Sequence, residues 1–206
     1  MSAQLRRASE RKPTHLRREE IADVAMRILA REGHRKFTTK YLAAEVGITE
    51  GAIFRHFASM EAIADAIVER MGEALLPSLL GEEADPMQRL HGFFQHRATM
   101  LVEKPELARL LLSDHLAQAA GEDHAARVEA FRRKTQRFVM ECLTQAKEKK
   151  RLAPEVSLES AIRLVMGSLM ALGHGGSFPT KAKQGESIDD LWRLIERALR
   201  GNEAAR

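Results

Sequence analysis

Cysteine is almost absent from this chain of 206 residues, which has Cys142 alone. A single thiol cannot form an internal disulfide or a cysteine-rich metal site, and such scarcity is typical of proteins of a reducing cytoplasm. Glycine and proline are also few, and no stretch has the alternating pattern of β-strands. Alanine, leucine, arginine and glutamate are abundant, and all four favour helices. The composition therefore predicts an all-α fold of about nine helices.

Long hydrophobic runs are missing as well. The longest lies within Leu164–Gly173, about ten residues, whereas a bilayer-spanning helix needs roughly twenty. The N-terminal residues lack the apolar segment of a signal peptide. We therefore expect a cytoplasmic protein that does not bind membranes.

The formal net charge is only +4, but the positive excess is confined to one end. Residues 1–57 hold 12 Lys and Arg against 7 Asp and Glu, whereas residues 58–206 hold 21 against 22. This asymmetry predicts that the N-terminal end faces a polyanion and that the remainder is a neutral body.

Residues 1–13 form a predicted basic arm that contains Arg6, Arg7, Arg11 and Lys12. One interpretation is a solvated tail. The other is an arm that lies along DNA phosphates or in a minor groove, as such segments do beside DNA-reading helices.

Residues 38–57, TTKYLAAEVGITEGAIFRHF, have the pattern of a helix-turn-helix. Thr38 and Thr49 are predicted N-caps of helices over about 39–46 and 50–57. Gly47 can adopt the left-handed conformation that a tight turn requires. Small Ala43 and apolar Ile53 stand where the two helices must cross and pack. We predict a DNA-binding domain over residues 14–60, with this motif as its reading unit.

Residues 61–206 are predicted to form a helical regulatory and dimerisation domain. Its segment Leu164–Gly173 is apolar almost all round, so both sides of this helix must be covered. Two explanations remain open: a homodimer interface, or the interior of a larger monomeric bundle. For the dimer, the predicted interface residues on the last two helices are Val165, Leu169, Leu172, Leu191, Trp192 and Ile195.

Over Arg17–Met71, and more loosely beyond, the chain resembles the TetR family of bacterial transcriptional regulators. The resemblance implies a homodimer that places one reading helix per protomer in successive major grooves of a palindromic operator in double-stranded DNA. It implies a DNA-contacting set, namely Thr38, Thr39, Lys40, Thr49, Glu50, Gly51, Ala52, Phe54, Arg55 and His56. The sequence departs from the family at Phe54, where tyrosine is usual, and at Met60, where lysine is common, so it lacks the side chains for two phosphate contacts.

The resemblance also implies a pocket for a small apolar or amphipathic ligand within the body. Candidate lining residues are Phe93, Phe94, Arg97, Met100, His115, Phe131, Phe138, Met166 and Met170. Each can equally be an ordinary core or surface residue. The histidines lack metal-ligand spacing, and no nucleophile motif or acid–base pair is evident. We therefore predict no metal, no cofactor and no catalysis.

Three functional hypotheses follow from the sequence. The first is a repressor that a small molecule releases from its operator. The second is a DNA-binding dimer without a small-molecule inducer, acting as an activator or through a protein partner. The third is a helical enzyme or ligand-binding module that does not bind DNA.

Overall fold

The computed structural model describes residues 13–81, 83–174 and 184–201. In this part of the chain there are ten α-helices and two short 3-10 helices, and no strand. The elements are α1 (Thr14–Glu32), η1 (His34–Lys36), α2 (Thr39–Val46), α3 (Glu50–Phe54), α4 (Met60–Leu75), η2 (Leu76–Leu79), α5 (Pro86–Glu103), α6 (Pro105–Leu112), α7 (His115–Ala120), α8 (Glu122–Glu148), α9 (Leu158–Gly173) and α10 (Gln184–Arg200). The all-α prediction is confirmed.

Short polar side chains set where several helices begin. Thr49 Oγ1 accepts from Ala52 N at 3.2 Å, Ser59 Oγ from Ala62 N at 3.2 Å, and Asp85 Oδ1 from Met87 N at 2.8 Å. Each cap satisfies an amide that has no partner within the first helical turn. These contacts place the starts of α3, α4 and α5.

The main departure from the predicted elements lies around residue 113. The sequence favours one helix over about residues 105–119, but the structure divides it into α6 and α7. Ser113 is extended, with φ −118° and ψ 170°. The guanidinium of Arg132 donates to Leu111 O at 2.7 Å and to Ser113 O at 3.2 Å. The break is therefore stable because a residue distant in sequence satisfies the carbonyls it exposes.

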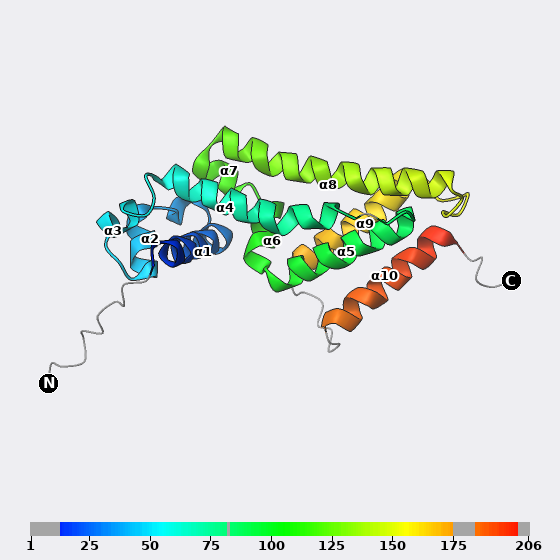
Figure 1. The fold of residues 1–206 in the computed structure, drawn as a ribbon, viewed down its shortest axis with the longest axis horizontal. Coiled ribbons are helices and arrows are strands. Elements are labelled where there is room, and N and C mark those ends of the chain that lie inside the picture. Colours follow the sequence, from blue (N-terminus) through cyan, green and yellow to red (C-terminus); the bar gives the residue numbers. More distant parts are fainter. Residues whose placement is uncertain (1–12, 82, 175–183, 202–206) are drawn as a thin grey trace.

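Helix α4 connects the α1–α3 group with the body of the molecule. Figure 1 shows it running from the group formed by α1, α2 and α3 into the body, where α8 lies beside it. Its inner residues Ile63, Ile67, Met71 and Leu75 are almost completely buried in one core that extends from α1 to α10. A displacement of α4 in the body would therefore move the α1–α3 group as well.

Polar contacts also join the α1–α3 group to the body. Arg70 of α4 pairs with Asp23 of α1, and Arg31 of α1 pairs with Glu106 of α6 at 2.6 Å. The ring Nδ1 of His115 lies 3.0 Å from Leu29 O, so α7 contacts α1 directly. The orientation of the α1–α3 group is thus held by several independent contacts.

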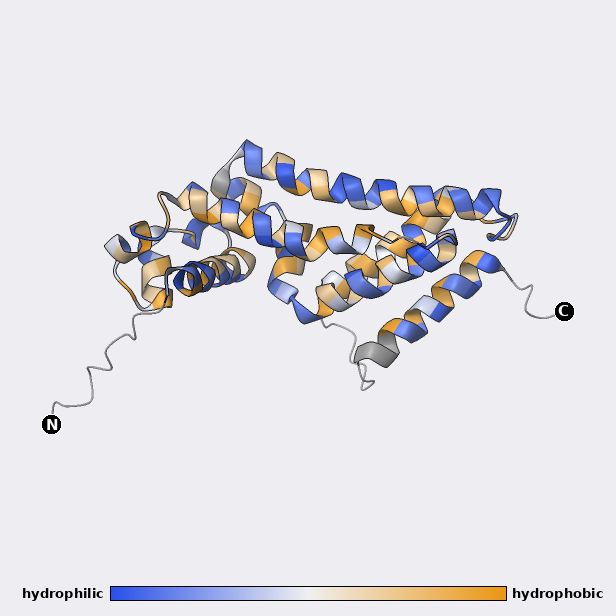
Figure 2. Cartoon of the chain, in the orientation of Figure 1, coloured by the Kyte–Doolittle hydropathy of each residue, from blue (hydrophilic) through white to orange (hydrophobic). Residues whose placement is uncertain are grey.

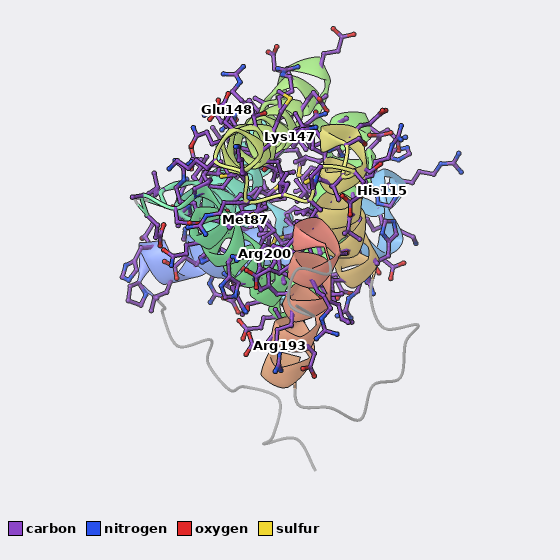
Figure 3. The ribbon with its side chains drawn as sticks, turned by 90° about the vertical axis from the view of Figure 1, so that its right-hand side faces the viewer. Met87, His115, Lys147, Glu148, Arg193 and Arg200 are labelled. Atoms are coloured by element: carbon purple, nitrogen blue, oxygen red, sulfur yellow. The ribbon has the colours of Figure 1, made fainter. Side chains whose placement is uncertain are left out.

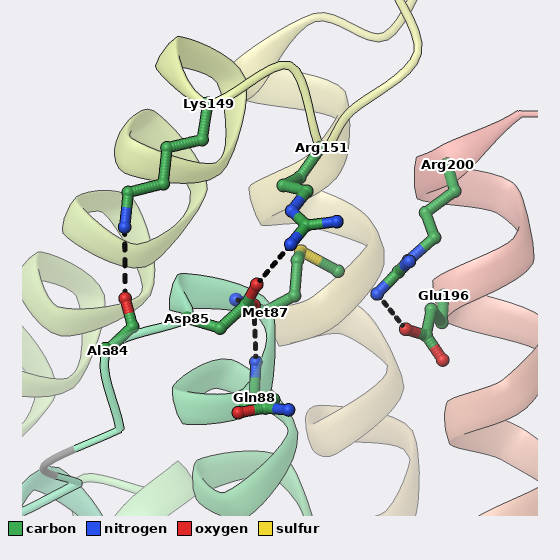
Figure 4. A network of polar contacts seen from close by, with 8 residues as sticks. All are labelled: Ala84, Asp85, Met87, Gln88, Lys149, Arg151, Glu196 and Arg200. Carbon is green, nitrogen blue, oxygen red and sulfur yellow. Dashed lines mark hydrogen bonds and ion pairs between the residues drawn. The ribbon is translucent and has the colours of Figure 1, made fainter.

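The opposite end of the body is closed by a second polar network. Asp85 caps α5 and pairs with Arg151 at 3.1 Å, while Lys149 Nζ donates to Ala84 O at 3.0 Å (Figure 4). Burial alone would raise the pKa of Asp85, but the backbone amides of Gln88 and Met87 and the charge of Arg151 lower it. This network ties the end of α8 to the start of α5.

Beside that network lies an open hollow of about 1280 Å³ between α10 and the end of α8. Figure 3 views this end, with Lys147 on α8 and Arg193 and Arg200 on α10. Most of its basic residues stand near the C-terminal ends of the two helices, where the helix dipoles favour cations. The basic character of the hollow therefore has a structural explanation.

The hydropathy pattern agrees with this packing. In Figure 2, α10 alternates hydrophobic and hydrophilic residues along its length, and its hydrophobic positions Ile188, Trp192, Ile195 and Leu199 are buried. Cys142 is also buried, which raises its thiol pKa to about 11 and makes the thiol a poor nucleophile. In the described ranges, no helix has the length and apolar character needed to cross a membrane.

Candidate functional site

The turn of the predicted helix-turn-helix is built around Gly47. Its φ of 76° and ψ of 35° lie in the left-handed region, and its amide donates to Ala43 O at 2.9 Å. Ile48 N also donates to Ala43 O, at 3.0 Å. No atom lies within 4 Å of the position that a Cβ on Gly47 would occupy. Glycine is therefore favoured here by backbone conformation and not by lack of space.

The inner faces of α2 and α3 form a small core. Leu42 and Ile53 are fully buried, and Ala43 and Phe57 nearly so. These are the positions at which the sequence pattern requires apolar or small side chains, so the predicted packing is confirmed. The reading helix α3 is short, because it ends at Phe54 and not near Phe57 as predicted.

The outer faces of α2 and α3 carry the predicted DNA-contacting residues. Lys40, Glu50, Gly51, Phe54 and Arg55 are exposed. The partly buried members are Thr39, Ala52 and His56, while Thr38 and Thr49 are exposed caps. The structure thus places the ten residues on the two helices and their caps, and their contact with DNA stays a prediction.

The chemistry of this surface suits a duplex. The side chain of Arg55 makes no hydrogen bond or ion pair among the described residues, so its guanidinium can reach a guanine edge or a phosphate. Nothing lies within 4 Å of a Cβ built on Gly51, so the helix surface there is open. The Phe54 ring is 48% exposed and has no donor, while Met60 packs partly against the core.

Tyr41 is a polar residue of α2 that the sequence interpretation did not include. Lys36 Nζ lies 5.1 Å from the centroid of its ring. Partial burial raises the pKa of Tyr41, and the carboxylates of Glu32 and Glu45 raise it further. The phenol therefore keeps its proton at neutral pH and can donate a hydrogen bond to a phosphate oxygen.

Arg18 of α1 was also missed, although it supports the reading helix directly. Its Nη1 donates to the carbonyl of His56, and its guanidinium carbon lies 4.2 Å from the centroid of the Phe57 ring. The contact joins residues 38 positions apart in sequence. Local sequence patterns carry no signal for such a contact. Arg18 positions the C-terminal end of the reading unit.

We expect Arg18→Ala to weaken specific DNA binding by about five- to ten-fold, because it removes one charge-assisted hydrogen bond and a cation–π contact that hold α3 in place. Fluorescence anisotropy with a labelled duplex measures the change. Arg27→Ala, an exposed substitution on the same helix, is the control. Equal affinity of the Arg18 and Arg27 variants would remove Arg18 from the positioning role.

A second candidate site is a cavity of about 620 Å³ in the body, between α5, α6, α8 and α9. Three of the nine predicted pocket residues line it, namely Arg97, Met166 and Met170. Apolar Leu101, Leu111, Ile162 and Leu169 add to its wall. Its volume lies in the range of small-molecule sites, roughly 300–1,000 Å³.

The other six predicted pocket residues do not line this cavity. Phe93, Phe94 and Met100 are core residues, and Phe138 packs on Phe93 with ring centroids 5.4 Å apart. Phe131 lies against Gly72, and His115 is turned toward α1. Their side chains are used in packing between helices, which a one-dimensional pattern does not distinguish from lining a cavity.

Arg97 is the unusual residue of the cavity wall. It is 3% exposed, and its Nη2 donates to Leu75 O at 3.0 Å and to Ser78 Oγ at 2.8 Å. Burial lowers its pKa to about 10, so it stays protonated at neutral pH. No carboxylate forms an ion pair with it among the described residues. A buried cation without a counter-ion is costly.

Most of the residues predicted for the dimer interface need correction. Val165, Leu169, Trp192 and Ile195 are at most 3% exposed within one protomer, and Leu172 and Leu191 are partly buried. Val165, Leu169, Trp192 and Ile195 pack within this chain's own core and cannot form the contact surface. The place of Leu172 and Leu191 in an interface stays a prediction. The exposed apolar residues of the same two helices are Leu164, Met170 and Leu194.

Comparison with known proteins identifies the N-terminal unit. Residues 21–67 match the model of the bacterial regulatory proteins of the tetR family. This N-terminal part of the chain is therefore similar to TetR-family regulators. The matched residues run from α1 through the helix-turn-helix into α4, and they overlap most of the domain predicted over residues 14–60.

Relatives extend the similarity over most of the chain. The nucleoid occlusion factor SlmA of Shewanella amazonensis is 27% identical over 191 residues, which cover 89% of this chain and 94% of that protein. The structure of the ketosteroid transcriptional regulator KstR2 of Mycobacterium tuberculosis has a TM-score of 0.77 at 18% identity, covering 89% of this chain and 94% of KstR2.

Another solved structure, AibR in complex with isovaleryl coenzyme A and operator DNA, has a TM-score of 0.69 at 18% identity and covers 89% of this chain and 98% of AibR. The solved structures show that the fold continues through the body. The chain therefore has the fold of these regulators, with an N-terminal helix-turn-helix unit and a C-terminal helical bundle.

Proposed function

We propose that this protein is a TetR-family repressor that binds a palindromic operator as a homodimer and releases it when a small amphipathic molecule enters the body cavity. In this proposal residues 1–13 are a basic arm, residues 14–60 read DNA, and residues 61–206 bind the ligand and pair the protomers. The arm lies outside the described residues, apart from Pro13. The protein would act on the bacterial nucleoid in the cytoplasm, without catalysis, metal or cofactor.

The observation that carries this proposal is the course of α4. The helix begins at Met60, just after the reading unit, and ends at Leu75, whose carbonyl accepts a hydrogen bond from a residue of the cavity wall. One rigid element thus contacts both sites. A ligand that favours a different position of α4 would change the distance between the two reading helices of a dimer, to the extent of its differential affinity for the two states.

A second candidate function is a DNA-binding dimer without a small-molecule inducer, acting as an activator or through a protein partner. The similarity to SlmA favours it, because that relative covers 89% of this chain and is described as a nucleoid occlusion factor. The pocket in the body favours the first candidate, since its volume and mostly apolar wall suit a small organic molecule.

Selection of duplexes from a random pool by the full-length protein tests the proposal. We expect enrichment of a palindrome whose half-sites lie about one helical turn apart, roughly 10 base pairs. Release of that duplex by a small organic molecule supports the repressor, whereas enrichment without release by any tested molecule supports the second candidate. If no sequence is enriched, both candidates are contradicted.

A further inference from the structure

Arg97 deepens the proposed function, because it touches both the cavity and the end of α4. We infer that the cavity takes a monoanionic amphiphile, a carboxylate on an apolar chain, and that Arg97 both binds the carboxylate and transmits its presence to α4. This inference rests on the proposed function, since it names the ligand class and the switching contact of the same site.

The charge of the ligand follows from the surroundings of Arg97. Its hydrogen bonds go to neutral oxygens, those of Leu75, Ser78 and Thr135. Asp114 is another residue of the cavity wall, but it is exposed and makes no ion pair with Arg97. An anion in the cavity would supply the missing counter-charge where water screens little.

Arg97 also has donors to offer. A guanidinium has five N–H groups, and the three hydrogen bonds of Arg97 use three of them. Its buried Nε has no partner, and its Nη1 makes only the 3.4 Å contact with Thr135 Oγ1. One N–H on each of these two atoms is therefore available to a carboxylate.

The other cations of the cavity are already engaged. Arg132 donates to two backbone carbonyls at the α6–α7 break, Leu111 O and Ser113 O. Arg163 is exposed and pairs with Glu159 at 2.7 Å. One available cation suits one negative charge, which disfavours phosphate-rich ligands. The remaining wall is mostly apolar, including Leu101, Ile162 and Met166, and it suits a hydrocarbon chain.

The same guanidinium holds the end of α4. Leu75 is the last residue of that helix, and its carbonyl accepts from Arg97 Nη2 and from Ser78 Oγ, the latter at 2.7 Å. A carboxylate that draws the guanidinium toward the cavity competes with Leu75 O and Ser78 Oγ. Loss of these hydrogen bonds would free the C-terminal end of α4 to move. Because the N-terminal end of α4 adjoins the reading unit, ligand binding would then change the position of the reading unit.

A purely structural role for Arg97 makes different predictions. If Arg97 only clamps α4, its removal should destabilise the fold, and acids should bind no better than alcohols. Burial lowers the pKa of Arg97, so the unfolded state holds the proton more tightly than the folded state. The buried charge therefore lowers the free energy of unfolding at pH 7, and this effect fades above about pH 10. Arg97→Met should then be no less stable than the wild type at pH 7.

The experiment uses the full-length protein and, as probes, saturated carboxylic acids of six to sixteen carbons, each with the alcohol of equal length. Calorimetric titration measures both dissociation constants. We expect at least one acid to bind about ten-fold tighter than its alcohol, as charge-assisted hydrogen bonds allow. Arg97→Met should abolish this preference and keep alcohol binding, which shows that the cavity is intact. Arg163→Gln removes an exposed cation of the same wall and should keep the preference for acids.

A second measurement needs no variant. Binding of the preferred acid to the wild type should be constant between pH 6 and 9 and weaken below the pKa of the acid, because the anion is the bound form. No preference for acids, a preference that survives in Arg97→Met, or tighter binding at low pH would each overturn the inference. If the selected duplex is bound while acids are not preferred, only this inference fails. If no duplex is selected, the proposed function fails regardless of the acids.

Discussion

Arg55→Ala should weaken binding to the selected operator by about thirty-fold or more. A good bidentate contact between arginine and guanine is worth ~1–3 kcal/mol, and a dimer makes the contact twice. Arg55 lies at the exposed end of α3 and its side chain has no partner among the described residues, so its loss leaves no buried group unsatisfied. The fold and the melting temperature should stay unchanged.

The matched control is Arg133→Ala, which removes an exposed arginine from α8 in the body. Anisotropy titrations at one salt concentration compare the two variants, because the affinity for DNA depends steeply on salt. A further titration with random duplex separates base reading from phosphate binding. If Arg55→Ala and Arg133→Ala bind the operator equally, α3 does not read DNA through Arg55.

Leu194→Glu should convert the proposed dimer to monomers. Leu194 is 60% exposed on α10, so a charge there costs little in an isolated protomer but becomes buried in a paired one. Leu164 and Met170 on α9 are also exposed apolar residues and would belong to the same pairing surface. Because one reading helix makes few contacts, operator affinity should fall toward the nonspecific level, on the order of 10³-fold.

The control for this prediction is Leu80→Glu, because Leu80 is 72% exposed and lies just after η2, on neither α9 nor α10. Sedimentation velocity at micromolar concentration gives the oligomeric state of both variants. A charge at Leu169 would test folding instead, since that side chain is buried within the protomer. A stable dimer of Leu194→Glu would place the pairing surface elsewhere.

Local sequence signals predicted the reading unit well. Thr38, Gly47 and Thr49 act through contacts within a few residues of themselves, namely two caps and a left-handed turn. Ala43 and Ile53 follow from helical spacing alone. These features depend only on neighbouring residues, so they can be predicted from the local sequence.

Features that depend on distant residues were less predictable. Leu164–Gly173 is apolar almost all round, so its periodicity could not tell which side faces its own core, and Val165 and Leu169 were assigned to the wrong side. The cavity wall depends on where four packed helices leave a space. The contact of Arg18 with the reading unit joins residues far apart in sequence. Tertiary packing decides all three.

Hydroxyl-radical footprinting of the wild-type protein on its selected duplex tests the central claim most directly, namely that a dimer reads DNA through α3. We predict two protected segments on one face of the duplex, about one helical turn apart, with two protomers bound per duplex. Both segments should disappear with Arg55→Ala. A single protected segment, or protection that persists unchanged with Arg55→Ala, would contradict the account.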